Sequence, residues 1–217
     1  MELVILLVGT FVVLVAYKSY SSIKVKSISA SMYEAASKND EEKFNTIIND
    51  KWTKWLIRPY YLNLSKIKFY TVNNDSKQLE NLADAVLGSK IRNNEKIGLL
   101  NPMFSYFIEN RNATYATKVF EGLKGCFENQ EQGKYLVEEL QILMDIYVKP
   151  KEKRVKDLQK YISQSTGDDK EIWQYRLATL YLNLDKKADA LKVLDEIRST
   201  TSNMSGYDSF VAKNIKD

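Results

Sequence analysis

The 217-residue chain contains no histidine, one cysteine, three prolines and eight glycines. Without histidine it can form neither a Ser-His-Asp or Cys-His nucleophile system nor a histidine-ligated metal site. The single cysteine, Cys126, excludes an intramolecular disulfide and a cysteine-ligated zinc site. Scarce glycine and proline favour long helices over a turn-rich β fold.

No paired-carboxylate motif stands out that could replace the excluded chemistries. The formal net charge of +4 is mild, whereas nucleic-acid binding usually needs a denser basic face. The sequence therefore predicts a protein that is not an enzyme, uses no cofactor and binds no nucleic acid. A carboxylate-dependent enzyme is the least favoured alternative.

The first feature that is present is the apolar run MELVILLVGTFVVLVAY. A helix over residues 3–20 would be roughly 27 Å long, close to the ~30 Å hydrocarbon core of a bilayer. No basic residue precedes the run and no A-x-A site follows it, which argues against a cleaved signal peptide. The run also lacks the polar face of a buried helix in a soluble domain. We therefore predict a transmembrane anchor at residues 1–20.

Positive charge follows this run and does not precede it. The positive-inside rule then places the N-terminus outside and the C-terminal domain in the cytoplasm, in a single-pass protein of the cell membrane. Residues 21–27 are expected to form a short basic juxtamembrane linker. The residues expected at the membrane interface are Tyr17, Lys18, Tyr20, Lys24 and Lys26.

From residue 28 to residue 199 the pattern is helical, with turn signals about every 35 to 40 residues. The clearest unit is EIWQYRLATLYLNLDKKADALKVLDEI, residues 171–197. Two helices joined by a turn as short as NLDKKA pack antiparallel. Residues recurring at helical spacing on the two sides of the turn are Leu177, Ala178, Tyr181, Ala190, Leu194 and Ile197.

This unit resembles a tetratricopeptide repeat. Leu177 and Ala178 match the large-small pair of the family, Tyr181 its aromatic position, and Ala190 its small residue on the second helix. The unit departs from the family pattern in having Asp185 where glycine is usual, and in lacking the early tryptophan and the closing proline.

Weaker copies of the spacing occur upstream, around the turns KND, NND and ENRN and near Pro150. Asp40, Asp75 and Asn112 are expected to cap the second helices of such pairs. The predicted fold is thus all-α: a transmembrane helix followed, over residues 28–199, by a tetratricopeptide-like solenoid of about five helix pairs. An irregular all-α domain without a true repeat is the alternative. Residues 200–217 are expected to be a polar tail or a short capping helix.

The resemblance implies that the first helices of the pairs line a concave groove for a protein or peptide. The family's carboxylate clamp needs basic and Asn residues at particular groove positions. One such row is occupied here by Leu64, Asn101, Leu140 and Tyr175, so no such clamp is predicted. The mixed apolar and aromatic set suits an extended apolar peptide or a helix. The groove residues implied are Tyr33, Lys68, Thr71, Ser105, Ile108, Glu109, Leu140, Met144, Tyr147, Tyr175, Thr179, Leu182 and Asn183.

The stretch KWTKWLIRPYY, residues 51–61, mixes aromatic and basic residues. Such mixtures can rest on a membrane surface. Trp52 and Trp55 are three residues apart, however, on one helical face, which is the usual sign of packing in a core. Core packing is the favoured interpretation.

Together these features predict a membrane-anchored scaffold or adaptor that binds a membrane-associated protein or peptide at the cytoplasmic face. Anchoring raises the effective concentration of the groove for partners in the same membrane. The alternative is an extracytoplasmic chaperone or assembly factor for exported proteins. The abundance of Lys, Asn and Ile is typical of a bacterial protein.

Overall fold

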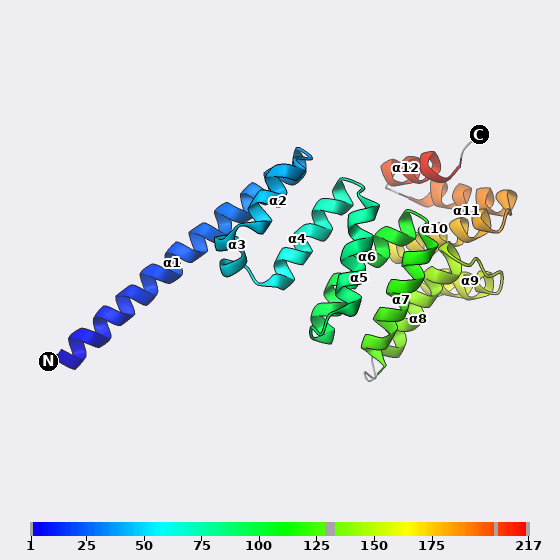
Figure 1. Ribbon diagram of the computed structural model, residues 1–217. Coiled ribbons are helices and arrows are strands. Elements are labelled where there is room, and N and C mark those ends of the chain that lie inside the picture. Colours follow the sequence, from blue (N-terminus) through cyan, green and yellow to red (C-terminus); the bar gives the residue numbers. More distant parts are fainter. Residues whose placement is uncertain (1, 129–132, 202–203, 216–217) are drawn as a thin grey trace. The chain divides into compact units, whose positions relative to one another are not determined.

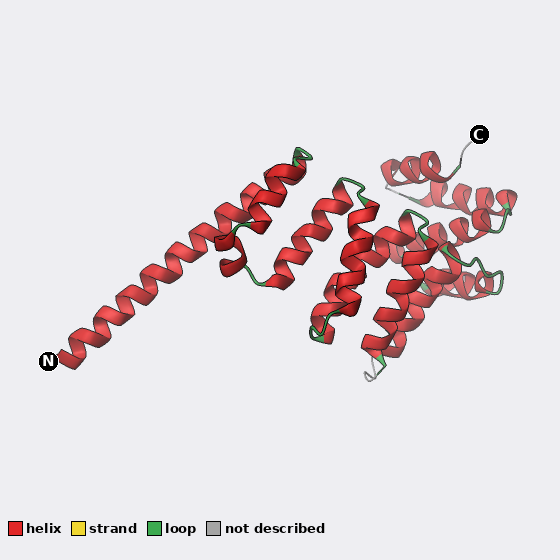
Figure 2. Ribbon diagram, in the orientation of Figure 1, coloured by secondary structure: helices red, strands yellow, loops and turns green. Residues whose placement is uncertain are grey.

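The computed structural model describes residues 2–128, 133–201 and 204–215, with their side chains from residue 18 onward. Within these ranges the chain forms twelve helices and no strand, which confirms the predicted all-α class (Figures 1 and 2). The helices are α1 (Glu2–Ser37), α2 (Glu41–Asn49), α3 (Lys51–Leu56), α4 (Pro59–Val72), α5 (Ser76–Gly88), α6 (Asn93–Glu109), α7 (Ala113–Phe127), α8 (Gly133–Tyr147), α9 (Arg154–Gln164), α10 (Gly167–Asn183), α11 (Lys187–Thr200) and α12 (Met204–Asn214).

The helices divide into two compact units, with the boundary inside α6 after Met103. In the N-terminal unit α2, α3 and α4 contact α1, and α5 contacts α4. In the C-terminal unit α8 contacts α7, α9 and α10, and α11 contacts both α10 and α12. Most of these contacts join helices that follow one another in the chain, which is the pairwise packing that the periodicity predicts.

The first helix is continuous from Glu2 to Ser37. Residues 21–27, expected to be a linker, lie inside this helix. The stretch contains neither glycine nor proline that would end a helix. No helix in the described part of the chain is both long and apolar enough to cross a membrane. The predicted anchor at residues 3–20 falls mostly on side chains outside the described set, so it stays a prediction.

One turn geometry recurs at four helix junctions, at Asn39, Asn74, Arg111 and Asp185. Each of these residues has a positive φ, of 52°, 54°, 55° and 59° respectively. In each turn the amide of the following residue donates to the carbonyl five positions earlier, at distances of 2.8 to 2.9 Å. This is the Schellman ending of a helix, in which one left-handed residue reverses the chain. The four turns are 35, 37 and 74 residues apart (74−39, 111−74 and 185−111).

Three of these turns continue directly into a side-chain cap. The side chains of Asp40, Asp75 and Asn112 accept hydrogen bonds from amides three residues later, at 2.9, 3.1 and 3.2 Å. Each bond satisfies an amide that has no partner within the first turn of a helix. The three predicted caps are therefore confirmed, and each couples the end of one helix to the start of the next.

Apolar residues at helical spacing form the two cores. In the N-terminal unit Phe44 stacks on Phe69, with ring centroids 4.1 Å apart. In the C-terminal unit Ala178 of α10 and Ala190 of α11 are completely buried, as close approach of the two helices requires. Leu177, Leu194 and Ile197, predicted from the same pattern, are buried in that core as well.

A buried ion network joins α8 to α9. Asp145 accepts from Arg154 at 2.9 Å and from Lys151 at 2.6 Å, and Arg154 also contacts the exposed carboxylates of Glu138 and Asp157. Burial alone raises the pKa of Asp145, but hydrogen bonds from Lys151, Arg154 and Gln141 outweigh it, so that the pKa is lowered. Asp145 therefore stays ionised at neutral pH, although it is almost fully buried.

Candidate binding groove in the C-terminal unit

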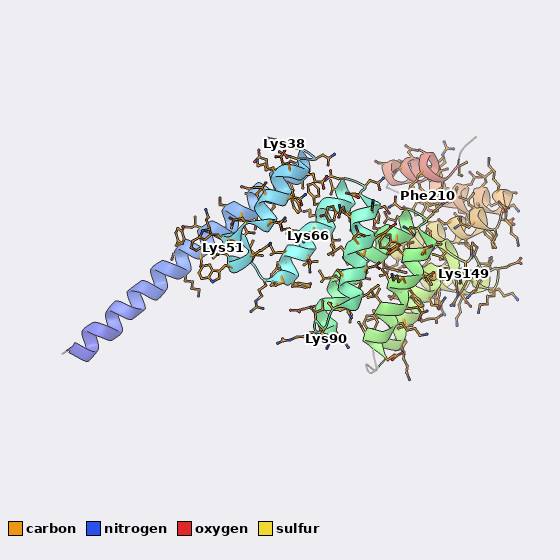
Figure 3. All side chains as sticks on the ribbon, viewed as in Figure 1. Lys38, Lys51, Lys66, Lys90, Lys149 and Phe210 are labelled. Atoms are coloured by element: carbon orange, nitrogen blue, oxygen red, sulfur yellow. The ribbon has the colours of Figure 1, made fainter. Side chains whose placement is uncertain are left out.

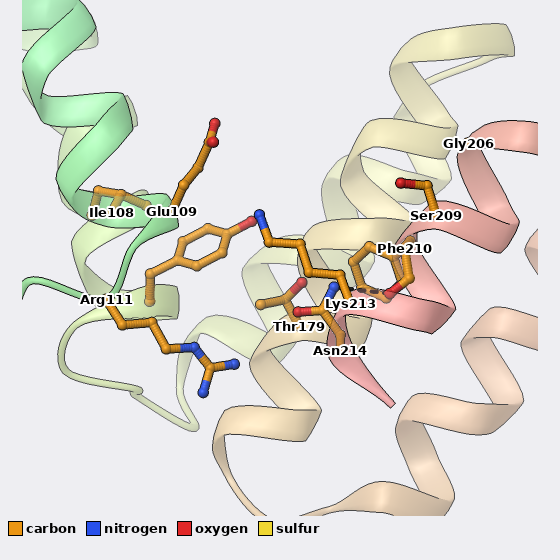
Figure 4. Close-up of a pocket in the computed structure, with 10 residues that line it drawn as sticks. Ile108, Glu109, Arg111, Thr179, Gly206, Ser209, Phe210, Lys213 and Asn214 are labelled. Carbon is orange, nitrogen blue, oxygen red and sulfur yellow. Dashed lines mark hydrogen bonds between the residues drawn. The ribbon is translucent and has the colours of Figure 1, made fainter. Parts of the chain in front are cut away.

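A cavity of about 770 Å³ opens in the C-terminal unit, between the C-terminal parts of α6, α8 and α10 on one side and α12 on the other (Figure 4). Its volume falls within the range of small-molecule and short-peptide sites. The lining residues are Ile108, Glu109, Arg111, Tyr147, Thr179, Gly206, Ser209, Phe210, Lys213 and Asn214.

One wall comes from the end of α6 and the turn that follows. Ile108 is buried, whereas Glu109 and Arg111 are exposed. Arg111 is the left-handed residue of its turn, and in Figure 4 its side chain and that of Glu109 extend in opposite directions from this edge of the cavity. This edge therefore carries one charge of each sign.

The floor consists of Tyr147 at the end of α8 and Thr179 on α10. The Thr179 hydroxyl donates to the backbone carbonyl of Tyr175 at 2.9 Å, which fixes its rotamer. Burial raises the pKa of Tyr147; a hydrogen bond with Thr179 and the charge of Arg176 oppose this, and the charge of Glu109 adds to it. The phenol is therefore neutral at physiological pH and can both donate and accept a hydrogen bond.

The opposite wall is α12. Its Phe210 ring lies 4.8 Å from the ring of Tyr175 on α10, which attaches α12 to the rest of the unit. Tyr207, Phe210 and Ile215 are partly buried and pack on the core of the unit. The stretch expected to be a polar tail or a short capping helix thus contains a helix that covers this core. In Figure 4 the Lys213 side chain extends from α12 toward the edge formed by Glu109, and a dashed line marks the bond from Asn214 to the Phe210 carbonyl.

The cavity thus combines the Tyr147 and Thr179 side chains of its floor and the apolar side chains of Ile108 and Phe210 with a rim of two cations, one carboxylate and further hydroxyl and amide groups. Such a lining can bind the backbone and mixed side chains of a peptide. The described residues contain no group of three or more Cys, Asp or Glu that could hold a metal ion.

Four residues of the predicted groove meet in this cavity: Ile108, Glu109, Tyr147 and Thr179. They come from α6, α8 and α10, which are the helices that the resemblance designates as groove-lining. Signals for the other lining residues were weak: Arg111 lies in a turn, and α12 presents polar residues toward the cavity. The spacing of Tyr207 and Phe210 was the one sequence feature that could have indicated the packing of α12.

Other predicted groove residues of this unit lie elsewhere. Leu140 and Met144 are buried between helices, and Tyr175 is covered by Phe210. Asn183 donates to the carbonyl of Ile146 at 2.8 Å, so it ties α10 to α8. Ser105 is exposed and Leu182 is half-buried, and neither lines the cavity.

The remaining predicted groove residues, Tyr33, Lys68 and Thr71, belong to the N-terminal unit. All three are exposed, and the Lys68 ammonium lies 5.4 Å from the centre of the Tyr33 ring. Lys68 and Tyr33 thus form a cation–π pair within the N-terminal unit.

Of the predicted interface residues, the side chain of Tyr17 lies outside the described set. Lys18, Tyr20, Lys24 and Lys26 are exposed on α1. The prediction that Trp52 and Trp55 pack in a core is wrong: their side chains are 64% and 60% exposed. On the six-residue helix α3 the residues turned inward are instead Thr53, which is buried, and Leu56.

Comparison with known proteins adds no relative to this description. No protein-family model, no curated protein and no solved structure matches the chain.

Proposed function

We propose that the protein is a membrane-anchored helical scaffold that holds a segment of a partner protein in the groove of its C-terminal unit. The observation that carries the proposal is the cavity itself. Residues chosen from the sequence as groove-lining, on three separate helices, line one cavity together with α12.

The recurring turns support the tetratricopeptide-like part of the proposal. Tetratricopeptide repeats are helix pairs with a period of about 34 residues, and the four Schellman turns are spaced at 35, 37 and twice 37 residues. A pair that turns near Pro150 fits the vacant position between Arg111 and Asp185. The proposal is therefore five units, of which the fourth has an irregular turn.

The partner best suited to the cavity is a peptide segment with an apolar anchor residue and charged neighbours. Ile108, Tyr147 and Phe210 provide apolar contacts, and the Tyr147 phenol provides a hydrogen bond. Arg111 and Lys213 would pair with a carboxylate of the segment, and Glu109 with a basic residue. A partner with charges of both signs beside an apolar residue would thus be selected over a purely apolar one.

A photo-crosslinking amino acid at Ser209, exposed on α12 at the cavity, tests the groove. We expect a specific crosslink to one partner segment in native membranes, identified by mass spectrometry. Reversing the exposed rim charges with Glu109→Lys and Arg111→Glu should abolish it, because both charges face the bound segment. The matched control is Lys160→Glu, an exposed charge reversal on α9 that should leave the crosslink intact.

Two results would count against the groove: an unchanged crosslink after both rim charges are reversed, or the same crosslink when the photoprobe is at Lys160. Circular dichroism of each variant establishes that its helices remain folded.

The cytoplasmic side is the second part of the proposal and rests on the lysines that follow the predicted anchor. Reporters active on only one side of the membrane, fused to the C-terminus, test it. Activity of the reporter that works outside the cytoplasm would replace this orientation with the alternative, an extracytoplasmic assembly factor.

A further inference from the structure

The largest exposed aromatic side chains of the N-terminal unit include a tryptophan pair on α3. Trp52 and Trp55 contact each other edge to face, with ring centroids 5.8 Å apart. Scattered exposed apolar residues need no explanation, but a contiguous aromatic patch usually marks a binding surface.

The local structure explains why the pair faces outward. The Asp50 carboxylate caps α3 by accepting from the Thr53 amide at 2.8 Å, and the Thr53 side chain is buried. At 100° per residue, Lys51 and Trp55 lie opposite Thr53 and Leu56 on the short helix, and Trp52 and Lys54 lie on its two flanks. All four of these outward residues are exposed, and Figure 3 labels Lys51 at the start of the helix.

The pair lies beside the part of α1 that follows the apolar run. A shallow hollow of about 470 Å³ is lined by Lys18, Ser21, Ser22, Val25 and Lys26 of α1 together with Trp55 and Leu56 of α3. Trp55 is therefore level with residues 18–26, which include the end of the predicted anchor and the residues just after it.

This region is strongly basic. Residues 18–33 and 51–58 contain six Lys or Arg (three in each segment) and no Asp or Glu. We name the residues Lys18, Lys26, Lys51, Trp52, Lys54 and Trp55 the α1–α3 surface. It combines aromatic rings with cations, the composition that is favoured where a protein meets lipid headgroups.

Dimensions place this surface at headgroup depth. Residues 18–26 span roughly 12 Å of the unbroken helix α1. The headgroup region on each side of a bilayer is about 5 to 8 Å thick. If α1 leaves the hydrocarbon near Tyr20, Trp55 and the surrounding lysines lie within reach of the phosphates.

We propose that the α1–α3 surface binds anionic phospholipid headgroups of the leaflet from which α1 emerges. The proposal deepens the proposed function and rests on its membrane anchor. A second copy of this chain is a poor occupant, since two such surfaces would bring their like charges together. Bilayer binding of α3 beside α1 gives the N-terminal unit two contacts with the membrane instead of one.

The test uses the full chain with Trp173→Phe, so that only Trp52 and Trp55 emit. The protein is reconstituted into vesicles of phosphatidylcholine with or without phosphatidylglycerol, both containing acyl chains brominated near the headgroup. With phosphatidylglycerol we expect a blue-shifted emission that the bromines quench. High salt should reduce the quenching, because the attraction to the anionic surface is screened.

The depth control carries its single tryptophan at Tyr33→Trp, with Trp52, Trp55 and Trp173 changed to Phe. Position 33 is exposed on the same helix, but roughly 22 Å beyond Lys18, so its emission should not be quenched. The charge variant Lys51→Gln with Lys54→Gln should lose the dependence on phosphatidylglycerol. The matched variant Lys77→Gln with Lys90→Gln, exposed positions on and just after α5, should keep it.

The surface and the anchor can fail separately. If alkaline carbonate extracts the chain while phosphatidylglycerol-dependent quenching persists, the anchor is wrong and the surface stands. If the chain resists extraction and Trp52 and Trp55 are not quenched, the surface is wrong. Three further results would overturn the surface: quenching at position 33 as strong as that of Trp52 and Trp55, quenching of Trp52 and Trp55 that is as strong without phosphatidylglycerol, or an emission shift that depends only on the protein density. The last result would indicate self-association instead.

Discussion

Trp52 and Trp55 in the N-terminal unit are largely exposed, whereas Trp173 in the C-terminal unit packs against the ring of Tyr161 at 4.8 Å and lies under the Arg176 guanidinium. All three residues sit on helices and occur in sequences that mix aromatic and charged residues. The ring of Trp173 packs against Tyr161 of the neighbouring helix α9 and is partly buried.

The charged groups of the two units differ in the same way. Glu34 contacts Lys38 at 2.7 Å and Lys43 at 2.8 Å on the surface of the N-terminal unit. The hydrogen bonds from these lysines lower its pKa to about 2. Asp145 and Arg154 in the C-terminal unit make equally short contacts inside the protein. Contact distance alone therefore does not distinguish an ion pair on the surface from one that stabilises the interior; the burial of the two side chains does.

Breaking the buried pair should give the largest effect. Arg154→Met leaves Asp145 buried with only one of its two cationic partners, Lys151, and we expect the unfolding free energy of the C-terminal unit to fall by about 3 kcal/mol. Denaturant unfolding followed by circular dichroism, with hydrogen exchange of α8 and α9, measures the change. The control Lys38→Met removes a partner of the exposed Glu34 and should leave the midpoint unchanged. Equal effects of the two variants would contradict the distinction.

Replacing tryptophans with alanine should change the unfolding free energy by different amounts in the two units, and the larger change should be smaller than that of Arg154→Met. Trp173→Ala removes a ring packed against Tyr161 and the core, and should cost about 2 kcal/mol. Trp52→Ala removes an exposed ring and should change the unfolding free energy by less than about 0.5 kcal/mol. The same unfolding assay applies, in detergent without anionic lipid. A large loss of stability in Trp52→Ala would show that this ring packs against the protein.

The smallest effect concerns Tyr175. Burial, followed by the charge of Glu171, raises the pKa of Tyr175 to about 12. The unfolded chain ionises at lower pH, so stability is fully present below about pH 10 and is lost as the pH rises toward 12.

In Tyr175→Phe this alkaline loss should shrink, and what remains should come from the other groups with a raised pKa, among them Tyr70 and Tyr147, whose pKa values burial also raises. At pH 7 the substitution should be nearly neutral, because the buried hydroxyl makes no hydrogen bond among the described residues. Unfolding midpoints between pH 7 and 11 measure both expectations. An alkaline loss identical to that of the original chain would contradict the assignment.

Much of the local architecture could be predicted from the sequence, because it depends on neighbouring residues. Asp40, Asp75 and Asn112 are side chains that cap helices wherever a turn precedes them, and each does so here. Ala178 and Ala190 recur at helical spacing around a short turn, and that spacing is sufficient to place them at the crossing of α10 and α11.

Contacts between segments distant in sequence could not be predicted. The i, i+3 spacing of Trp52 and Trp55 is matched by Thr53 and Leu56, and only the packing of α3 on α1 decides which pair faces inward. The polar rim of the cavity depends on α12, which lies about 100 residues after α6. Leu140 and Met144 fit the family positions, yet the depth of α8 in the core buries them.

The continuity of α1 has a mechanical consequence. No glycine or proline interrupts it between Lys18 and Ser37, so a rotation of one end of the helix about its axis also rotates the other end. Each residue inserted into α1 would rotate the helices that pack on it, α2, α3 and α4, by about 100° around the axis of α1 and shift them along it by about 1.5 Å. The direction in which the N-terminal unit faces around α1 would therefore depend on the number of inserted residues: seven would restore it to within about 20°, and two would nearly reverse it.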